Sequence, residues 1–202
     1  MERKKITVVG FVPRKKSDIS QLLLGIGSGA LMFTCNIIII VLLTNLPVNY
    51  RTVNYLDLIP LFVFNLASAF IQEFTFRGYP FLTLLEKYGA WGAQICIAIP
   101  FGLMHIHTNM DIKTIILTML TTGIGSLIFG AAYIKTRQLF LPTGIHTGWN
   151  FTQQIFLEVW HNRPDQHIHQ VNNAFLLFVI PYLVIMLITF FLIQKYCRRN
   201  TI

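Results

Sequence analysis

Six stretches of about 20 mostly apolar residues dominate this sequence, and each is long enough to cross a membrane as a helix. They run over residues 21–46, 58–85, 90–107, 114–134, 139–160 and 174–194. A backbone surrounded by lipid must satisfy its polar groups internally, which favours helices. Only 12% of the 202 residues are charged, against about 25% in ordinary soluble domains. We therefore predict an all-α, multi-pass transmembrane helix bundle with about six spans.

The basic residues predict the orientation of this bundle. If both termini are cytoplasmic, the inner side holds all of the 16 Lys and Arg residues except Arg51, Lys113 and Arg163. This is the asymmetry of the positive-inside rule. It predicts one transmembrane domain over residues 21–196, with basic cytoplasmic tails at 1–20 and 197–202. The basic residues cluster beside apolar runs rather than along one face, which argues for a lipid bilayer and against a nucleic-acid partner.

Two ionisable residues interrupt the second apolar stretch, in the segment SAFIQEFTFRGYPF. A charge in the hydrocarbon region costs about 2.5–3.5 kcal/mol on insertion scales, so it marks a candidate functional site. Glu73 and Arg77 are four residues apart, on one helical face, and can form an ion pair. A purely structural ion pair would also explain them if they stood alone.

Two further stretches carry polar residues. His105 ends the segment FGLMH, and the segment GIHTGWN contains His146 and Asn150, again four residues apart. We expect Gly89 to form the turn between the second and third spans, and Pro80 to kink the second. Glu73 and His105 are then equally far from that turn along the chain. Three spans that each carry polar side chains predict one shared intramembrane pocket.

These residues resemble the three motifs of the CAAX prenyl protease and bacteriocin-processing family (CPBP, or Abi) of intramembrane endopeptidases. The family pattern is a double glutamate, three residues and an arginine, then F-x-x-x-H, then H-x-x-x-N or H-x-x-x-D. Here Arg77 precedes Gly78, Phe101 lies four residues before His105, and His146 lies four before Asn150. The resemblance covers about residues 58–154.

The resemblance implies metal-independent peptide hydrolysis without a cofactor. A carboxylate and the second-motif histidine would activate a water molecule, and His146 and Asn150 would stabilise the oxyanion. This chain departs from the pattern because Gln72 stands where the family has its first glutamate. His105 could then be the base with Gln72 positioning the water, Glu73 could take over, or proteolysis could be lost. The predicted site residues are Gln72, Glu73, Arg77, His105, His146 and Asn150.

The leading prediction is a bacterial cell-membrane endopeptidase that acts on a peptide or a membrane-associated protein, in peptide maturation or bacteriocin self-immunity. The alternative is a non-catalytic family member that binds a peptide or a membrane partner. A zinc peptidase with Glu73, His105 and His146 as ligands lacks the H-E-x-x-H helix of such enzymes. A small transporter is disfavoured, because the sequence shows neither two nearby carboxylates nor paired broken helices.

Overall fold

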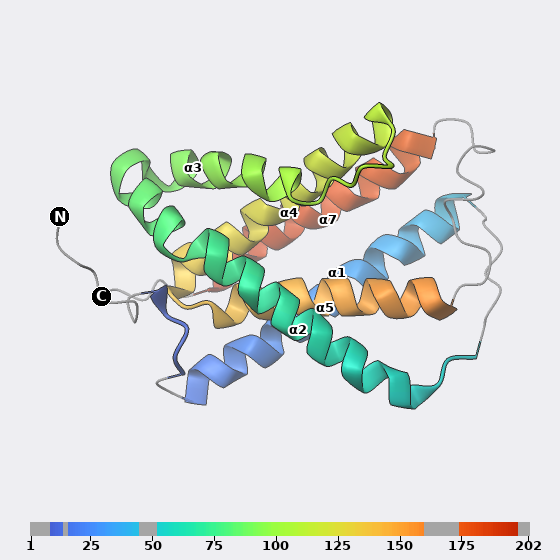
Figure 1. Cartoon of the computed structure of the whole chain (residues 1–202), viewed down its shortest axis with the longest axis horizontal. Coiled ribbons are helices and arrows are strands. Elements are labelled where there is room, and N and C mark those ends of the chain that lie inside the picture. The colour runs from blue at the N-terminus through green and yellow to red at the C-terminus, as the bar shows by residue number, and fades with distance from the viewer. Residues whose placement is uncertain (1–8, 14–15, 45–51, 160–173, 198–202) are drawn as a thin grey trace.

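The computed structural model describes residues 9–13, 16–44, 52–159 and 174–197, and every regular element within these ranges is a helix. The prediction of an all-α fold is confirmed. The predicted tails lie partly outside the described residues, at 1–8 and 198–202. Figure 1 shows the helices, which are α1 (Lys16–Thr44), α2 (Tyr55–Arg77), α3 (Tyr79–Leu103), α4 (Ile112–Thr136), α5 (Phe140–Val159) and α7 (Ala174–Tyr196).

Four helical stretches of the described chain are long and apolar enough to cross a membrane. They are Lys16–Thr44, Tyr55–Leu103, Ile112–Thr136 and Leu176–Tyr196. The second stretch contains both α2 and α3, which the sequence predicts as separate spans. Helix α5 is not among the four. These helices indicate a membrane protein, whereas six crossings are still a prediction.

The boundary between α2 and α3 differs from the sequence prediction. The predicted helix over 58–85 with a kink at Pro80 is wrong, because α2 ends at Arg77. Gly78 leaves the helical region, with ψ −131°, and Pro80 then sits in the first turn of α3, where its missing N–H is tolerated. Gly89 interrupts α3 with φ +71°, a conformation that suits glycine, so the turn expected there is present. Because α2 ends at Arg77, Glu73 lies one turn before the end of this helix.

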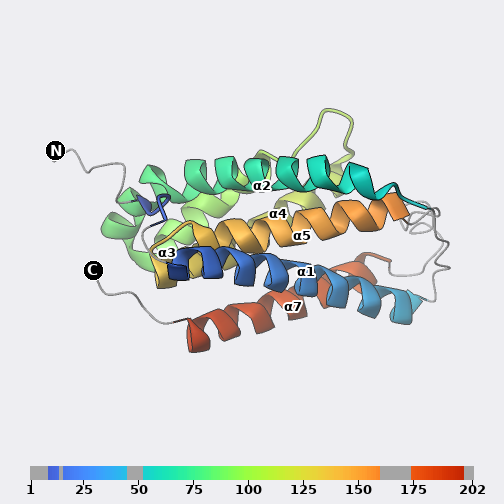
Figure 2. The same cartoon turned by 90° about the horizontal axis from the view of Figure 1, so that it is seen from below.

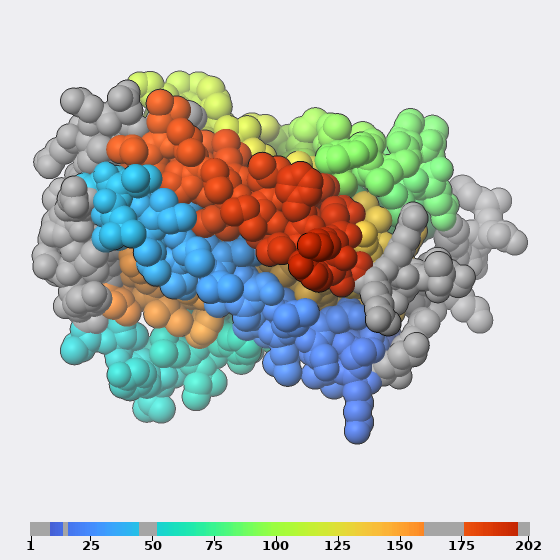
Figure 3. Space-filling view, turned by 180° about the vertical axis from the view of Figure 1, so that it is seen from behind, coloured from blue at the N-terminus to red at the C-terminus, as the bar shows by residue number. Residues whose placement is uncertain are grey.

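Helix α5 occupies the centre of the bundle and contacts α1, α2 and α4. Figure 2 shows α2, α5, α1 and α7 in that order from one side of the bundle to the other. Helix α7 packs on α1 and α4, and Figure 3 shows it lying beside α1 on one face of the molecule. The Tyr182 hydroxyl donates to the Thr121 carbonyl, and Lys135 Nζ donates to the Gln194 carbonyl. These two bonds attach α7 to α4 at well-separated points.

A seam of four glycines brings α1 and α5 together. Gly25 and Gly29 of α1 face Gly144 and Gly148 of α5, and each helix thus contributes a G-x-x-x-G pair. A Cβ added at Gly25 would lie 2.6 Å from the Leu141 carbonyl oxygen, and one at Gly29 would clash with the Ile145 carbonyl. Small residues at this spacing allow two helix backbones to touch, as in many membrane helix pairs.

The outside of the bundle is apolar, whereas several of its charged and polar side chains are inside. Large hydrophobic side chains such as Leu23, Val63 and Leu187 are exposed. Glu73 and Arg77 are fully buried. This distribution is the one expected in a protein that faces lipid and surrounds a polar centre.

The start of the described chain packs against one end of the bundle. Val9 is buried, and its carbonyl accepts a hydrogen bond from the Tyr133 hydroxyl. The Leu139 N–H donates to the Gly10 carbonyl, and Phe11 stacks edge-on against Phe74. Part of the segment predicted as a basic tail is therefore anchored to the helices.

Candidate active site

Helix α2 places Glu73 and Arg77 on its buried face. Asn65, Ala69, Glu73 and Arg77 recur every four residues and form the buried stripe of α2. Arg77 Nη1 lies 3.4 Å from Glu73 Oε1. The predicted ion pair is therefore present, inside the protein rather than at its lipid-facing surface.

The Arg77 guanidinium is held mainly by α4 and by two aromatic rings. Arg77 Nη2 donates to the Ser126 carbonyl at 2.8 Å and to the Ser126 hydroxyl. Its Cζ lies 4.7 Å from the Phe101 ring centre and 5.4 Å from that of Phe129. Cation–π contact and charge-assisted hydrogen bonds offset part of the cost of burying this charge. Arg77 consequently fixes the Glu73 carboxylate next to α4.

His146 of α5 completes a buried network with Glu73. His146 Nδ1 lies 2.9 Å from Glu73 Oε1, and the imidazole stacks on Phe129 with ring centres 4.6 Å apart. An ionised carboxylate can only accept, so Nδ1 carries the hydrogen. Nε2 is then the ring nitrogen left for another partner. Glu73 thus lies between Arg77 and His146 and contacts both.

His105 lies just beyond the C-terminal end of α3, which stops at Leu103 rather than at the predicted residue 107. Its Nδ1 is 2.8 Å from the Phe101 carbonyl oxygen, which can only accept. The hydrogen is therefore on Nδ1, and neutral His105 offers a lone pair on Nε2. Burial lowers the pKa of this loop histidine below its usual 6.5; nearby His146 and His107 also lower the pKa, while the Phe101 carbonyl raises it.

A cavity of about 490 Å³ brings three of the predicted residues together. His105, His146 and Asn150 line it, and the remaining lining comes from α1, α3, α4, α5 and α7. Glu73 is not in the wall; it lies behind His146, fully buried. The cavity lining thus contains the two imidazoles and the Asn150 amide, and the buried Glu73 carboxylate and Arg77 guanidinium lie behind His146.

Comparison with known families gives the same assignment as the motifs. Residues 54–152 match the family model described as type II CAAX prenyl endopeptidase Rce1-like. This part of the chain belongs to the Rce1-like family. The Rce1-like segment contains all six predicted site residues, whereas α1 and α7 lie outside it. No curated protein and no solved structure gives a significant match. At the level of the family, the match indicates an intramembrane endopeptidase of the CAAX-protease type.

Gln72 of the Rce1-like segment precedes Glu73 in α2, but it makes no hydrogen bond to the network and is not among the residues that line the cavity. It is half-buried, its Nε2 donates to the Ser68 hydroxyl at 3.1 Å, and its Oε1 has no hydrogen-bond partner among the described residues. One turn further along α2, Phe76 packs on Phe101, which lies one turn before His105. Helix α2 and the second half of α3 run in opposite directions (Figure 1). Gln72 lies one turn before Phe76 and His105 one turn after Phe101, so this spacing puts both on the same side of the aromatic contact.

Sequence reasoning missed the residues of α4 that hold this site, Ser126 and Phe129. They occur in the segment GIGSLIFGAA, a run in which six of the ten residues are Gly, Ser or Ala. Small side chains allow close approach of neighbouring helices, so the run was the available signal. What it could not show is which helix would approach.

No three His, Cys, Asp or Glu side chains group into a possible metal site within the parts of the chain that the structure describes. Glu73, His105 and His146 thus do not form the ligand set that the zinc alternative requires.

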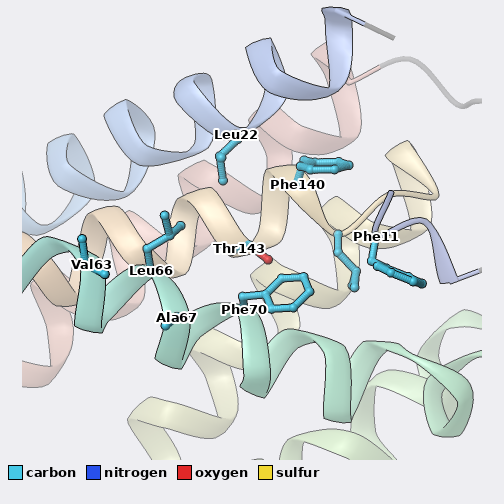
Figure 4. A pocket seen from close by; sticks show the side chains of 9 residues that line it. Phe11, Leu22, Val63, Leu66, Ala67, Phe70, Phe140 and Thr143 are labelled. Atoms are coloured by element: carbon cyan, nitrogen blue, oxygen red, sulfur yellow. The ribbon is translucent and has the colours of Figure 1, made fainter. Parts of the chain in front are cut away.

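A second cavity, of about 340 Å³, lies between α1, α2 and α5. Figure 4 shows its lining side chains, which are hydrophobic except for Thr143 of α5. Thr143 is buried, and its hydroxyl oxygen has no hydrogen-bond partner in the described ranges. None of the predicted site residues lines this cavity.

Proposed function

We propose that the protein is an intramembrane endopeptidase that hydrolyses a peptide bond with a water molecule activated by His105. The observation that carries the proposal is the hydrogen bond from His146 to buried Glu73, beside a cavity that His105 and Asn150 also line. An ionisable network buried next to a cavity is where catalytic groups are expected. The Rce1-like match supports the same reaction class.

His105 takes the role of the general base. Glu73 is unsuited to it, because it is fully buried and already bound to His146 and Arg77. In neutral His105, Nε2 can accept a proton while Nδ1 is held by the Phe101 carbonyl. Gln72, which cannot accept that proton, would orient the water through its unused amide oxygen.

His146 and Asn150 stabilise the charge that develops on the scissile carbonyl. The water oxygen attacks the carbonyl carbon, its proton moves to His105 Nε2, and negative charge builds on the carbonyl oxygen. A His146 imidazolium and the Asn150 amide can donate to this oxygen. Glu73 compensates the positive charge on His146. The carbon–nitrogen bond then breaks as His105 returns the proton to the leaving amine.

The helices are proposed to cross the membrane six times, with both ends in the cytoplasm. The first residues of α1 and the last residues of α7 lie at the same end of the bundle, which supports this topology (Figure 2). The charge distribution supports the same orientation. We place the protein in a bacterial cell membrane, with a peptide or a membrane-associated protein as its substrate. Peptide maturation and bacteriocin self-immunity are the processes that the family resemblance favours.

The decisive test is cleavage of a fluorogenic peptide library by the purified protein in lipid nanodiscs. His105→Ala should lower kcat/KM at least 100-fold, because it removes the base. His107→Ala, in the same loop but exposed, is the matched control and should keep full activity. Gln72→Glu should raise kcat/KM, because it adds a second proton acceptor beside the water. Equal activity of wild type, His105→Ala and His107→Ala would refute the proposal.

A non-catalytic peptide-binding protein is the second candidate function. Gln72 favours it, since the residue with which the family activates water is replaced by an amide. The two candidates differ in one outcome. A binding protein would bind library peptides without cleaving them, and Gln72→Glu would not confer cleavage.

A further inference from the structure

Part of the lining of the cavity at His105 and His146 comes from α1 and α7, two helices that the family match does not cover. Phe33, Asn36 and Ile40 come from α1, and Val179 and Met186 are among the residues that come from α7. Figure 3 shows α1 and α7 lying side by side on that face of the molecule. All six predicted site residues lie in the Rce1-like segment, whereas α1 and α7 add lining residues from outside it.

We propose that Asn36 binds a backbone N–H of the peptide substrate and thereby sets which bond lies at the histidines. This inference rests on the proposed function, because it assigns a substrate-binding residue to that cavity. Asn36 is 8% exposed and lines the cavity. Its Oδ1 is buried and has no hydrogen-bond partner within the described ranges. A buried amide oxygen without a partner is costly, so a ligand that supplies a donor would relieve the cost.

The threonines of α4, a helix within the family match, add hydrogen-bond acceptors to the lining of the same cavity. Thr118, Thr121 and Thr122 line the cavity. The hydroxyl groups of Thr121 and Thr122 donate to carbonyls of their own helix, at 2.9 and 2.6 Å. Their remaining capacity is to accept. The Tyr182 hydroxyl also donates to a carbonyl of α4.

The ligand that fits this wall brings neutral N–H donors and apolar side chains. The described lining contains no Asp, Glu, Lys or Arg, and its other residues are largely apolar. Beside Asn36 Oδ1 and the threonines an anionic group would face acceptor oxygens, and a plain hydrocarbon would leave Asn36 Oδ1 unsatisfied. An extended uncharged peptide provides both features, because its backbone N–H groups recur along an apolar chain.

The experiment combines Asn36→Leu with removal of single N–H groups from the peptide. Binding of fluorescein-labelled, uncharged decapeptides to nanodisc-embedded protein is measured by fluorescence polarisation, and mass spectrometry of the same samples reports cleavage. The best-bound peptide is then N-methylated at one backbone position at a time. Thr143→Val is the matched control, because it removes a buried, unpartnered oxygen from the second cavity.

For wild type, methylation at one position should weaken binding about 10-fold, the effect of one lost hydrogen bond. Asn36→Leu should weaken binding of the unmethylated peptide by a similar factor and abolish the sensitivity at that position. Thr143→Val should behave like wild type. Unchanged affinity in Asn36→Leu, retained sensitivity at that position, or no binding by any peptide would overturn the inference. Binding that follows this pattern without cleavage would leave the inference standing and refute the proposed function.

Discussion

The two faces of α5 differ in what they contribute. Gly144 and Gly148 face α1 with backbone against backbone, whereas His146 and Asn150 line the cavity. At about 100° per residue, His146 lies roughly 200° around the helix from Gly144, on nearly the opposite side. One face consists of residues without side chains, and the other carries the polar groups of the site.

The glycine face of α5 fixes the position of the helix, whereas its polar face takes part in the proposed chemistry. The glycine face determines the position of α5, because a backbone contact leaves little freedom for the helix to slide or rotate. The polar face needs that constraint, since the bond from His146 to Glu73 is possible only in one register. Substitutions on the glycine face should consequently lower the unfolding free energy, whereas substitutions on the polar face should lower the rate of cleavage.

The largest effect is expected from His146→Ala. It removes an oxyanion donor, which typically costs 10²–10³-fold in rate, together with the group that Glu73 orients. We expect kcat/KM to fall about 10³-fold, equivalent to about 4 kcal/mol. Glu73 keeps Arg77 as a partner, so the amount of folded protein in the membrane should stay near wild type. Activity within 10-fold of wild type would exclude His146 from the catalytic step.

Gly29→Ala should affect folding instead. The added Cβ would clash with the Ile145 carbonyl and approach the backbone nitrogen of Trp149, so α1 and α5 must move apart. We expect a loss of about 3 kcal/mol of unfolding free energy, as for overpacking in a tight core. Thermal denaturation in detergent micelles measures it.

Gly27→Ala is the matched control for Gly29→Ala, because nothing lies within 4 Å of a Cβ at that position. It should be neutral or slightly stabilising, since alanine favours helices over glycine by up to about 1 kcal/mol. Equal melting temperatures for the two variants would show that the glycine seam does not hold α1 to α5.

The sequence predicted the helical fold and the meeting of Glu73, Arg77 and His146, because intramembrane charges must find partners inside the bundle. It did not predict the end of α2 at Arg77. A proline predicts a kink, but whether the helix ends before it depends on the conformation of Gly78. The same limit applies to Ser126 and Asn36. Neither residue shows by its type which helix it will face, and only the packing of α4 and α1 does so.

The pH dependence of cleavage tests whether the polar face of α5 acts together with a neutral His105 as the base. The base must be unprotonated, and burial lowers the pKa of His105 below 6.5, with His146 and His107 adding to the effect. As the pH falls, activity should therefore persist to below pH 6.5 before it is lost. The midpoint of the acid limb of kcat/KM measures this. A midpoint at or above 6.5 would contradict His105 as the base.

The smallest effect is expected from Thr143→Val, which tests whether α5 needs polarity in the second cavity. The Thr143 hydroxyl oxygen lacks a partner among the described residues, and its neighbours are hydrophobic. Valine has nearly the same shape, and it removes a buried oxygen that gains no hydrogen bond there. The unfolding free energy should stay unchanged or rise by up to about 1 kcal/mol, with kcat/KM unaffected. A loss of activity without a loss of stability would show that the second cavity takes part in the reaction, and that α5 carries function on more than one face.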